Sequence, residues 1–294
     1  PFYYIPQPYI PYYLIKKIRN NFNHNNIFFV FFISFLIIPV IIDILTIGQT
    51  TFPLKKLFIR ADSFIKYQLG DTIFPKVIIG EYDWLIYSDD ISIRDYQNTW
   101  SFTVEDLKII EKNLLYLKNY IDSMDADLYI IIPPNKNTIY PAYIPSQIPK
   151  MSDVSRIDQV MAIAKKHSEL NLIDLRERFH QAKEHELVYY KTDTHWNYRG
   201  AFLAYKILLE KINKDFPEIK PFKFDHFAHS IKPDRKGDLA NLIQVNLNED
   251  FYQSEPKDIS NFQLQEYDGY SVIKQKNNNC LRLVIYHDSF GNSL

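Results

Sequence analysis

Helix-like and strand-like patterns alternate along the middle of the chain, and this alternation constrains the fold more than any other feature. Residues 103–124 carry apolar side chains at helical spacing, with Thr103 as the expected N-cap. The apolar run 127–134 follows at once and is typical of a strand buried on both faces. An α/β domain with a parallel sheet covered by helices on both faces is therefore predicted. Helix, strand, helix, short strand and helix are then expected in turn over 154–169, 171–175, 176–186, 188–190 and 198–214.

Three further segments complete the predicted domain. Two short apolar runs within 77–90 flank a Gly-Glu-Tyr-Asp turn and predict a hairpin. Residues 214–279 are polar and irregular, which indicates an insertion with short strands. The apolar run 281–287 predicts a final buried strand.

The N-terminal part contains an apolar segment of a different kind. Residues 27–42 carry no charge and a single hydroxyl, that of Ser34. Extended to residue 48, the segment approaches the roughly 20 residues that cross a hydrocarbon core as a helix. A buried core helix and a cleaved signal peptide are the alternatives, but the segment is longer than the usual apolar part of a signal peptide. We expect an uncleaved transmembrane anchor.

This anchor divides the chain into a juxtamembrane segment over 1–26, the anchor over 27–48, a linker over 49–74 and a domain over 75–294. Because the chain begins at Pro1 and stops just after a Ser-Phe-Gly turn, we expect a fragment whose domain is incomplete at its C-terminus. Basic residues on the two sides of the anchor nearly balance and do not decide its orientation. They are Lys16, Lys17 and Arg19 before the anchor and Lys55, Lys56 and Arg60 after it.

Composition excludes several classes of protein. Hydrophobic residues make up 46% of the chain and charged residues 23%, as in a globular protein and unlike a disordered one. The formal net charge of -1 gives no positive field for nucleic acid, which we do not expect as a partner. Cys280 is the single cysteine, so neither an intramolecular disulfide nor a cysteine-rich zinc site can form.

Polar clusters follow three of the predicted strands, at 133–138, 191–197 and 287–292. Because the C-terminal ends of parallel strands meet at one edge of a sheet, we expect the three clusters to lie together. The first cluster contains Asn135 and Lys136, which are candidates for binding a substrate.

Ser289 in the third cluster is a candidate nucleophile. It follows a predicted buried strand and precedes Gly291, where a tight turn can expose a hydroxyl beside backbone N–H groups. Gly291 and Asn292 are candidates for stabilising an oxyanion. A serine in this setting is more often a turn or helix-cap residue, and this alternative stays open.

Asp193 and His195 in the second cluster have the spacing of a base and its orienting carboxylate. Side chains two residues apart in an extended loop point the same way, so the Asp193 carboxylate can orient the His195 imidazole. An ordinary hydrogen-bonded loop is the alternative. Trp196 is a candidate wall of a binding site, with packing in the core as its alternative role.

A metal site would use many of the same residues. Asp193, His195, His287 and Asp288 offer imidazole and carboxylate ligands. The sequence contains no HExxH, no paired CxxC and no glycine-rich phosphate loop, so we expect neither a metal nor a cofactor.

Joined together, these motifs resemble those of a known family. The stretch 189–205, followed downstream by HDSFGNSL at 287–294, resembles the alginate O-acetyltransferase family (AlgJ/AlgX-like), membrane-linked proteins with an SGNH-hydrolase-like domain. The segments 78–87, 133–145 and 236–243 resemble further stretches of that family, so the resemblance covers roughly residues 75 to 294.

The resemblance implies an SGNH-hydrolase-like three-layer α/β fold with a mainly parallel sheet, preceded by one transmembrane helix. It implies Ser289 as the nucleophile, His195 as the general base and Asp193 as the orienting carboxylate. It further implies a single-pass protein of the cytoplasmic membrane whose domain, on the periplasmic or extracellular side, acetylates an alginate-like or other exopolysaccharide. A multi-spanning membrane acyltransferase is the implied partner that supplies the acetyl group.

Two other functions would use the same constellation. A carbohydrate acetyl esterase would pass the acetyl group to water instead of a sugar hydroxyl. A non-catalytic, polysaccharide-binding scaffold of a secretion complex would keep these side chains as a surface that contacts sugar. The residues alone do not separate the three functions.

Overall fold

The computed structural model describes residues 32–34, 37, 55–258, 262–268, 270–275 and 282–293. The chain divides into two compact units, residues 1–59 and 60–294, and the second holds most of the described residues. Within the described ranges, no helix combines the length and the apolar character needed to cross a membrane. The predicted anchor over 27–48 lies almost entirely outside those ranges and stays a prediction.

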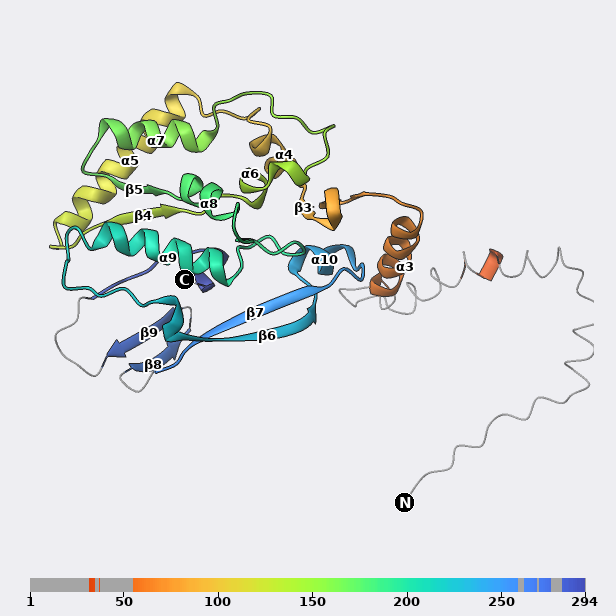
Figure 1. Cartoon of the computed structure of the whole chain (residues 1–294). Coiled ribbons are helices and arrows are strands. Elements are labelled where there is room, and N and C mark those ends of the chain that lie inside the picture. Colours follow the sequence, from red (N-terminus) through yellow and green to blue (C-terminus); the bar gives the residue numbers. More distant parts are fainter. Residues whose placement is uncertain are drawn as a thin grey trace, which may run out of the picture. The chain divides into compact units, whose positions relative to one another are not determined.

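Helices and strands alternate from residue 55 onward (Figure 1). In chain order, the helices are α3 (Lys55–Gln68), α4 (Asp90–Tyr96), α5 (Val104–Asp122), α6 (Lys136–Ile139), α7 (Arg156–Lys166), α8 (Arg176–Ala182), α9 (Tyr198–Ile212) and α10 (Asp238–Ile243). The strands are β1 (Ile73–Phe74), β2 (Val77–Ile79), β3 (Leu85–Tyr87), β4 (Tyr129–Ile132), β5 (Asn171–Asp174), β6 (Phe227–Arg235), β7 (Glu249–Pro256), β8 (Phe262–Tyr267) and β9 (Tyr270–Gln275).

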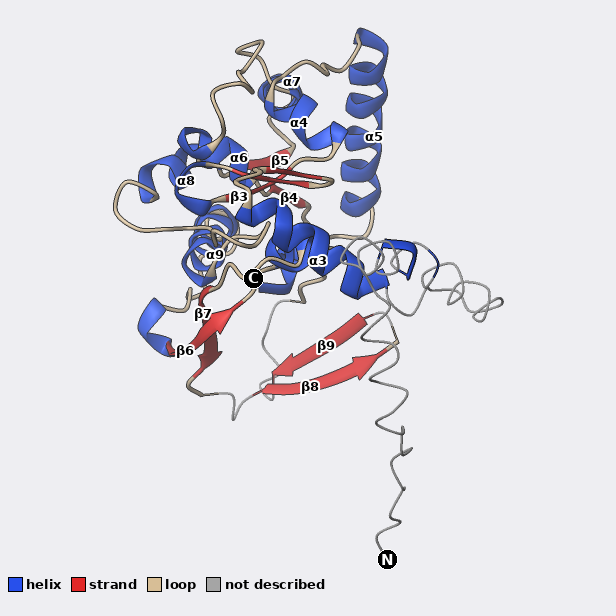
Figure 2. Cartoon of the chain, turned by 90° about the vertical axis from the view of Figure 1, so that its right-hand side faces the viewer, coloured by secondary structure: helices blue, strands red, loops and turns tan. Residues whose placement is uncertain are grey.

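A layer of strands lies between two layers of helices. β4 and β5 pair in parallel, with Tyr129 opposite Asn171 and Ile132 opposite Asp174. α5 and α7 lie on one side of this pair and α9 lies on the other (Figures 1 and 2). The helices and strands predicted between 103 and 186 and the helix predicted over 198–214 are thereby confirmed, including Thr103 as the N-cap of α5, whereas the short strand predicted over 188–190 is not.

The main core fills the space between these layers. Its largest fully buried side chains are aromatic, and rings from distant segments meet there, because large flat side chains bury the most apolar area. Trp84 stacks on Tyr143 with ring centroids 4.3 Å apart, and Phe179 packs against Trp196 at 5.9 Å. Leu175, Ile139, Val188 and Ala204 close the cluster.

A second core joins the predicted hairpin to α10. β2 and β3 pair antiparallel, with Val77 opposite Tyr87, which confirms the hairpin. Val77 and Leu85 pack against Leu239 of α10, and all three side chains are fully buried. This packing fixes α10 beside β3, and the first turn of α10 then lies at the end of the strand layer.

The sheet is mixed, which corrects the expectation of a mainly parallel one. β4 and β5 form the parallel pair, whereas the other described strands pair antiparallel as β1-β2-β3, β6-β7 and β8-β9. Residues 188–190 contribute an isolated bridge between Tyr189 and Trp196 instead of a strand. The strands predicted within 214–279 are present, but they form long hairpins. β4 itself is only half-buried.

The predicted final strand over 281–287 is absent from the described part of that segment. Residues 282–288 have no regular structure, and Tyr286 is 96% exposed. An apolar run becomes a strand only where a neighbouring strand accepts and donates its backbone hydrogen bonds. No described strand pairs with this segment, so its apolar side chains face outward.

Thr103→Ala is expected to lower the free energy of unfolding by about 1 kcal/mol, because it removes the N-cap of α5. The Thr103 hydroxyl accepts from the Asp106 N–H at 3.1 Å, and the Asp106 carboxylate accepts from the Thr103 N–H at 2.9 Å. Urea unfolding followed by circular dichroism measures the change. Val104→Ala, at a side chain 66% exposed, is the control. Equal stability of the two variants would contradict the capping role.

Candidate active site

The loop from Tyr190 to His195 is closed at its base by the bridge between Tyr189 and Trp196. The Tyr190 N–H donates to the His195 carbonyl at 3.4 Å, and the Asn197 N–H donates to the Val188 carbonyl at 3.0 Å. Asn197 then caps α9 by accepting from the N–H groups of Arg199 and Gly200. The loop therefore begins and ends at fixed points, with Asp193 near its middle and His195 beside the bridge that closes it.

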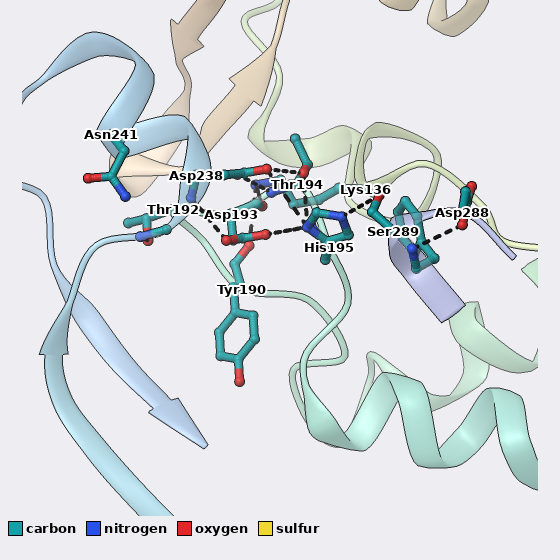
Figure 3. Close-up of polar contacts among 12 residues, drawn as sticks. Lys136, Tyr190, Thr192, Asp193, Thr194, His195, Asp238, Asn241, Asp288 and Ser289 are labelled. Carbon is teal, nitrogen blue, oxygen red and sulfur yellow. Dashed lines mark hydrogen bonds and ion pairs between the residues drawn. The ribbon is translucent and has the colours of Figure 1, made fainter. Parts of the chain in front are cut away.

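Three side chains form a continuous hydrogen-bonded line across this loop (Figure 3). His195 Nδ1 lies 2.7 Å from Asp193 Oδ1, and His195 Nε2 lies 2.8 Å from Ser289 Oγ. Ser289 begins the 3₁₀ turn Ser289–Ser293, whose Phe290 packs against the His195 ring at 4.9 Å. The structure thus brings together the three residues that the sequence singled out for nucleophilic chemistry.

The electrostatics of this line favour a charged histidine. The hydrogen bond to the Asp193 carboxylate raises the pKa of His195, although partial burial opposes the rise. Burial would raise the pKa of Asp193, but hydrogen bonds from His195 and from the Asp238 N–H outweigh it and lower that pKa. Because the folded-state pKa of His195 is raised and that of Asp193 is lowered, the stabilisation from this pair is complete only between about pH 4 and about pH 6.5. It is lost as the pH rises through that raised pKa.

Asp238, the first residue of α10, supports the loop in two ways. Its N–H donates to Asp193 Oδ2 at 2.9 Å, which leaves Asp193 Oδ1 for the histidine. Its carboxylate accepts from the Thr194 N–H at 2.8 Å and from the Thr194 hydroxyl. Gly237 permits this approach, because a Cβ there would lie 2.3 Å from the Thr192 carbonyl oxygen. The sequence placed Gly237 and Asp238 in a resembling stretch but gave them no role.

Glu249 at the start of β7 holds the other side of the loop. Its carboxylate accepts from the N–H of Lys191 at 2.9 Å, from the N–H of Thr192 at 2.6 Å and from the Thr192 hydroxyl at 2.7 Å. Sequence reasoning missed Glu249, because its partners are mostly backbone groups and it lies in a polar segment without a motif.

The remaining candidate residues lie elsewhere or are engaged. Trp196 is 2% exposed and belongs to the core, so it does not line an open site. The Asn135 amide donates to Asp95 at 3.3 Å. The Gly291 N–H donates to the Asp288 carbonyl at 3.1 Å, within its own turn, and Asn292 is exposed. Lys136 is buried, and its amine donates to backbone carbonyls.

The structure brings together only some of the candidate metal ligands. Among the described residues, Asp193, His195 and Asp238 each place a ligand atom within 4.8 Å of the others, a group that excludes His287 and Asp288. The three ligand groups already take part in the hydrogen bonds described above. The His287 ring instead contacts the Asp288 carbonyl at 2.7 Å. These contacts are those of a histidine bonded to the Asp193 carboxylate, which the Asp238 N–H holds in place.

Comparison with protein families identifies the chain. A family model described as "SGNH hydrolase-like domain, acetyltransferase AlgX" matches residues 77–279, which is more than half of the chain. The chain belongs to the AlgX acetyltransferase family. The AlgX match includes Asp193 and His195 and ends before Ser289. An SGNH-hydrolase-like α/β fold follows from this membership.

Individual relatives carry related names. The "Probable alginate O-acetylase AlgJ" of Pseudomonas putida is 26% identical over 198 residues, which cover 66% of this chain and 49% of the relative. The protein of the same name from Pseudomonas aeruginosa is 25% identical over 200 residues, which cover 66% and 48%. The chain thus spans about half the length of the curated relatives it matches.

Solved structures are also similar, at lower sequence identity. The O-acetyltransferase domain of Pseudomonas putida AlgJ has 22% identity and a TM-score of 0.44, and the match covers 63% of this chain and 67% of that one. Bacillus cereus PatB1 has 20% identity and a TM-score of 0.48, with 67% and 65% covered. Assignment to the AlgX family rests on the family match alone.

Asp193→Asn is expected to lower the pKa of His195 towards its ordinary value, because it removes the charge that favours the imidazolium but keeps the size of the side chain. Titration of the His195 ring by NMR, assigned by comparison with His195→Ala, measures the shift. Asp225→Asn is the control, since its carboxylate lies 3.9 Å from His226. An unchanged His195 pKa in Asp193→Asn would show that the pair does not form in solution.

Proposed function

We propose that this chain is an O-acetyltransferase that carries an acetyl group on Ser289 and passes it to a hydroxyl of a polysaccharide. One observation carries the proposal: Ser289 Oγ and Asp193 Oδ1 occupy the two ends of the His195 imidazole, at 2.8 and 2.7 Å. A nucleophile, a base and an orienting carboxylate in this order are what covalent acyl transfer requires. Membership of an acetyltransferase family supports the choice of acyl group.

The first half of the proposed reaction forms an acetyl-enzyme. His195 Nε2 takes the proton of Ser289 Oγ as this oxygen attacks the acetyl carbonyl of an ester donor. The tetrahedral intermediate collapses when the bond to the donor oxygen breaks, and the imidazolium returns its proton to that oxygen. Asp193 stabilises the imidazolium between these steps and holds the ring in one tautomer.

The second half transfers the acetyl group to sugar. The hydroxyl of the acceptor loses its proton to His195 Nε2 and attacks the acetyl carbonyl, and the Ser289 oxygen leaves with that proton. Because the Gly291 N–H is engaged within its own turn, the Asn292 side chain and the Ser289 N–H are the proposed oxyanion donors. The exposure of Ser289 supports access by a polymer, which cannot enter an enclosed pocket. Water in place of the sugar would make the same chain an esterase.

We further propose that the acceptor is an alginate-like or other exopolysaccharide and that a multi-spanning membrane acyltransferase supplies the acetyl group. The names of the AlgJ relatives support a polysaccharide acceptor. Export follows from this acceptor, and the charge-free run over 27–42 supports an anchor in the cytoplasmic membrane.

Ser289→Ala is expected to reduce acetyl release from a chromogenic acetyl ester by about 10³-fold or more, because no oxygen is left to form the acetyl-enzyme. The assay is run with and without acceptor oligosaccharide, and mass spectrometry detects acetylated sugar. Ser230→Ala, at an exposed serine of β6, is the control.

The outcomes of this assay separate the three functions. Release that depends on Ser289 and moves onto the sugar when acceptor is present supports a transferase. Release that ignores the acceptor indicates an esterase. A folded protein that releases no acetate at all contradicts both and favours the binding scaffold.

Deletion of residues 27–48 is expected to move the protein from the membrane fraction to the soluble fraction of the cell, because it removes the proposed anchor. Immunoblotting of the separated fractions measures the change, and deletion of residues 1–26 is the control. Equal distribution of intact and deleted protein would contradict the anchor. Protease treatment of intact spheroplasts then reports which side carries the domain.

A further inference from the structure

Lys136 occupies an unusual position for a charged side chain. It is the first residue of α6, three residues beyond the start of the short loop that follows β4, and only 4% of it is exposed. Its Nζ donates to the carbonyl oxygens of Tyr190 at 3.2 Å, Lys191 at 3.0 Å and Asp193 at 2.6 Å. The amine also lies 5.7 Å from the centre of the Trp84 ring. Figure 3 shows Lys136 close to the Asp193 and His195 side chains.

These contacts exclude the substrate-binding role expected from the sequence. In its charged form the Lys136 amine has three N–H donors and no acceptor, and here three carbonyl oxygens lie in hydrogen-bond reach and take all three donors. No donor remains for a sugar or an acetyl group, and the burial of the side chain keeps both away. Lys136 can therefore affect the site only through the loop whose carbonyls it binds.

Burial of this amine has a cost that the surrounding charges reduce. Removal from water lowers the pKa of Lys136 to about 7, while the carboxylates of Glu249, Asp193 and Asp238 favour the charged form. A buried ammonium is tolerated only where hydrogen bonds and opposite charges compensate its lost hydration. This buried amine binds backbone carbonyls of the loop that carries Asp193 and His195, so it lies beside the hydrogen-bonded line from Asp193 to Ser289.

The carbonyl of Asp193 is the decisive contact. It belongs to the peptide between Asp193 and Thr194, so it lies between the carboxylate that orients the histidine and the histidine itself. Asp193 receives N–H donors on its side chain from Asp238 and His195, but its backbone oxygen is held by Lys136. Without the amine, this peptide keeps only the bond from its Thr194 N–H to the Asp238 carboxylate at 2.8 Å, and a shift of its unheld carbonyl moves the Asp193 carboxylate relative to His195 Nδ1.

We infer that Lys136 is a positioning residue, whose amine holds the carbonyls of Tyr190, Lys191 and Asp193 so that Asp193 and His195 stay aligned with Ser289. The inference rests on the proposed function for its effect on rate, but its structural part does not need activity to be tested.

Two effects of Lys136 on His195 have opposite signs and can be told apart. If the amine acts by position, its loss weakens the bond between His195 and Asp193, and the pKa of His195 falls. If the amine acts only as a nearby positive charge, its loss makes the imidazolium easier to form, and the pKa of His195 rises. The other charged groups that act on His195 are Asp193, Asp238 and Asp288, and these stay unchanged.

Lys136→Met is the deciding variant, because it keeps a long side chain and removes all three donors. NMR titration is expected to give a lower His195 pKa, in the direction of the Asp193→Asn variant. Acetyl release is expected to lose roughly 100-fold in kcat, the effect of a misplacement near 1 Å, with KM unchanged because Lys136 does not touch the substrate.

Lys183→Met is the matched control. Its Nζ also donates to a backbone carbonyl, that of Ile139 at 2.7 Å, and lies 5.9 Å from the Tyr140 ring, but it has no bond to the loop. This variant is expected to keep the wild-type His195 pKa and kcat. A general loss of stability from removing a lysine would affect both variants, whereas a loss of alignment affects Lys136→Met alone.

An unchanged or raised His195 pKa in folded Lys136→Met would overturn the inference. If Lys136→Met does not fold, Lys136→Gln decides: its amide has two N–H donors and cannot hold three carbonyls, so a wild-type His195 pKa in that variant would overturn the inference equally. An inactive wild-type protein would contradict the proposed function and still leave the His195 titration readable. The two failures are therefore distinguishable.

Discussion

The site depends on how the backbone of one loop satisfies its hydrogen bonds. Beyond the bridge at Tyr189 and Trp196, the Leu85 N–H of β3 donates to the Lys191 carbonyl at 3.0 Å, and charged side chains bind other backbone groups of the loop. Each buried N–H or C=O group left without a partner costs about 1–3 kcal/mol. Glu249 accepts from two of the loop's N–H groups, and Lys136 donates to three of its carbonyls. These bonds hold the backbone of the loop in place, and from it the His195 side chain reaches Ser289.

The same supports shape the electrostatics around the histidine. Two carboxylates, Asp193 and Asp238, lie near His195 Nδ1, at 2.7 and 3.8 Å, and both favour the imidazolium. Asp238 is kept in place by its bonds to Thr194, and the packing of Leu239 beside β3 fixes the helix that carries it. The second core therefore contributes to the geometry of the candidate site, because it determines where the α10 N-terminus meets the loop.

Most of the helices and strands between residues 103 and 212 follow from the sequence, because their apolar periodicity and their capping residues agree. Thr103 and Asp106 form a reciprocal cap, and Ser155 and Asp158 form another. The run over 281–287 shows the limit of such patterns. Its apolar composition is that of a buried strand, yet a strand also needs a partner edge, and composition carries no information on that.

The residues of the candidate site also differ in whether the sequence predicts them. Asp193, His195 and Ser289 can be found from side-chain chemistry and from family resemblance, since the proposed reaction uses their side chains. The parts played by Lys136, Glu249 and Gly237 cannot, because each acts on main-chain atoms. A sequence motif identifies functional residues by the type of their side chains. It does not show which backbone carbonyl an amine will bind, because every residue has a carbonyl.

This asymmetry bears on which substitutions the loop can accept over time. The three oxygens that Lys136 binds belong to the peptide backbone, so they are present whatever side chains stand at positions 190 and 191. Tyr190 and Lys191 are free to drift as far as this contact is concerned, whereas a single amine, that of Lys136, serves all three oxygens. A change at position 136 therefore removes three hydrogen bonds at once, while a change of side chain at position 190 or 191 removes none of them.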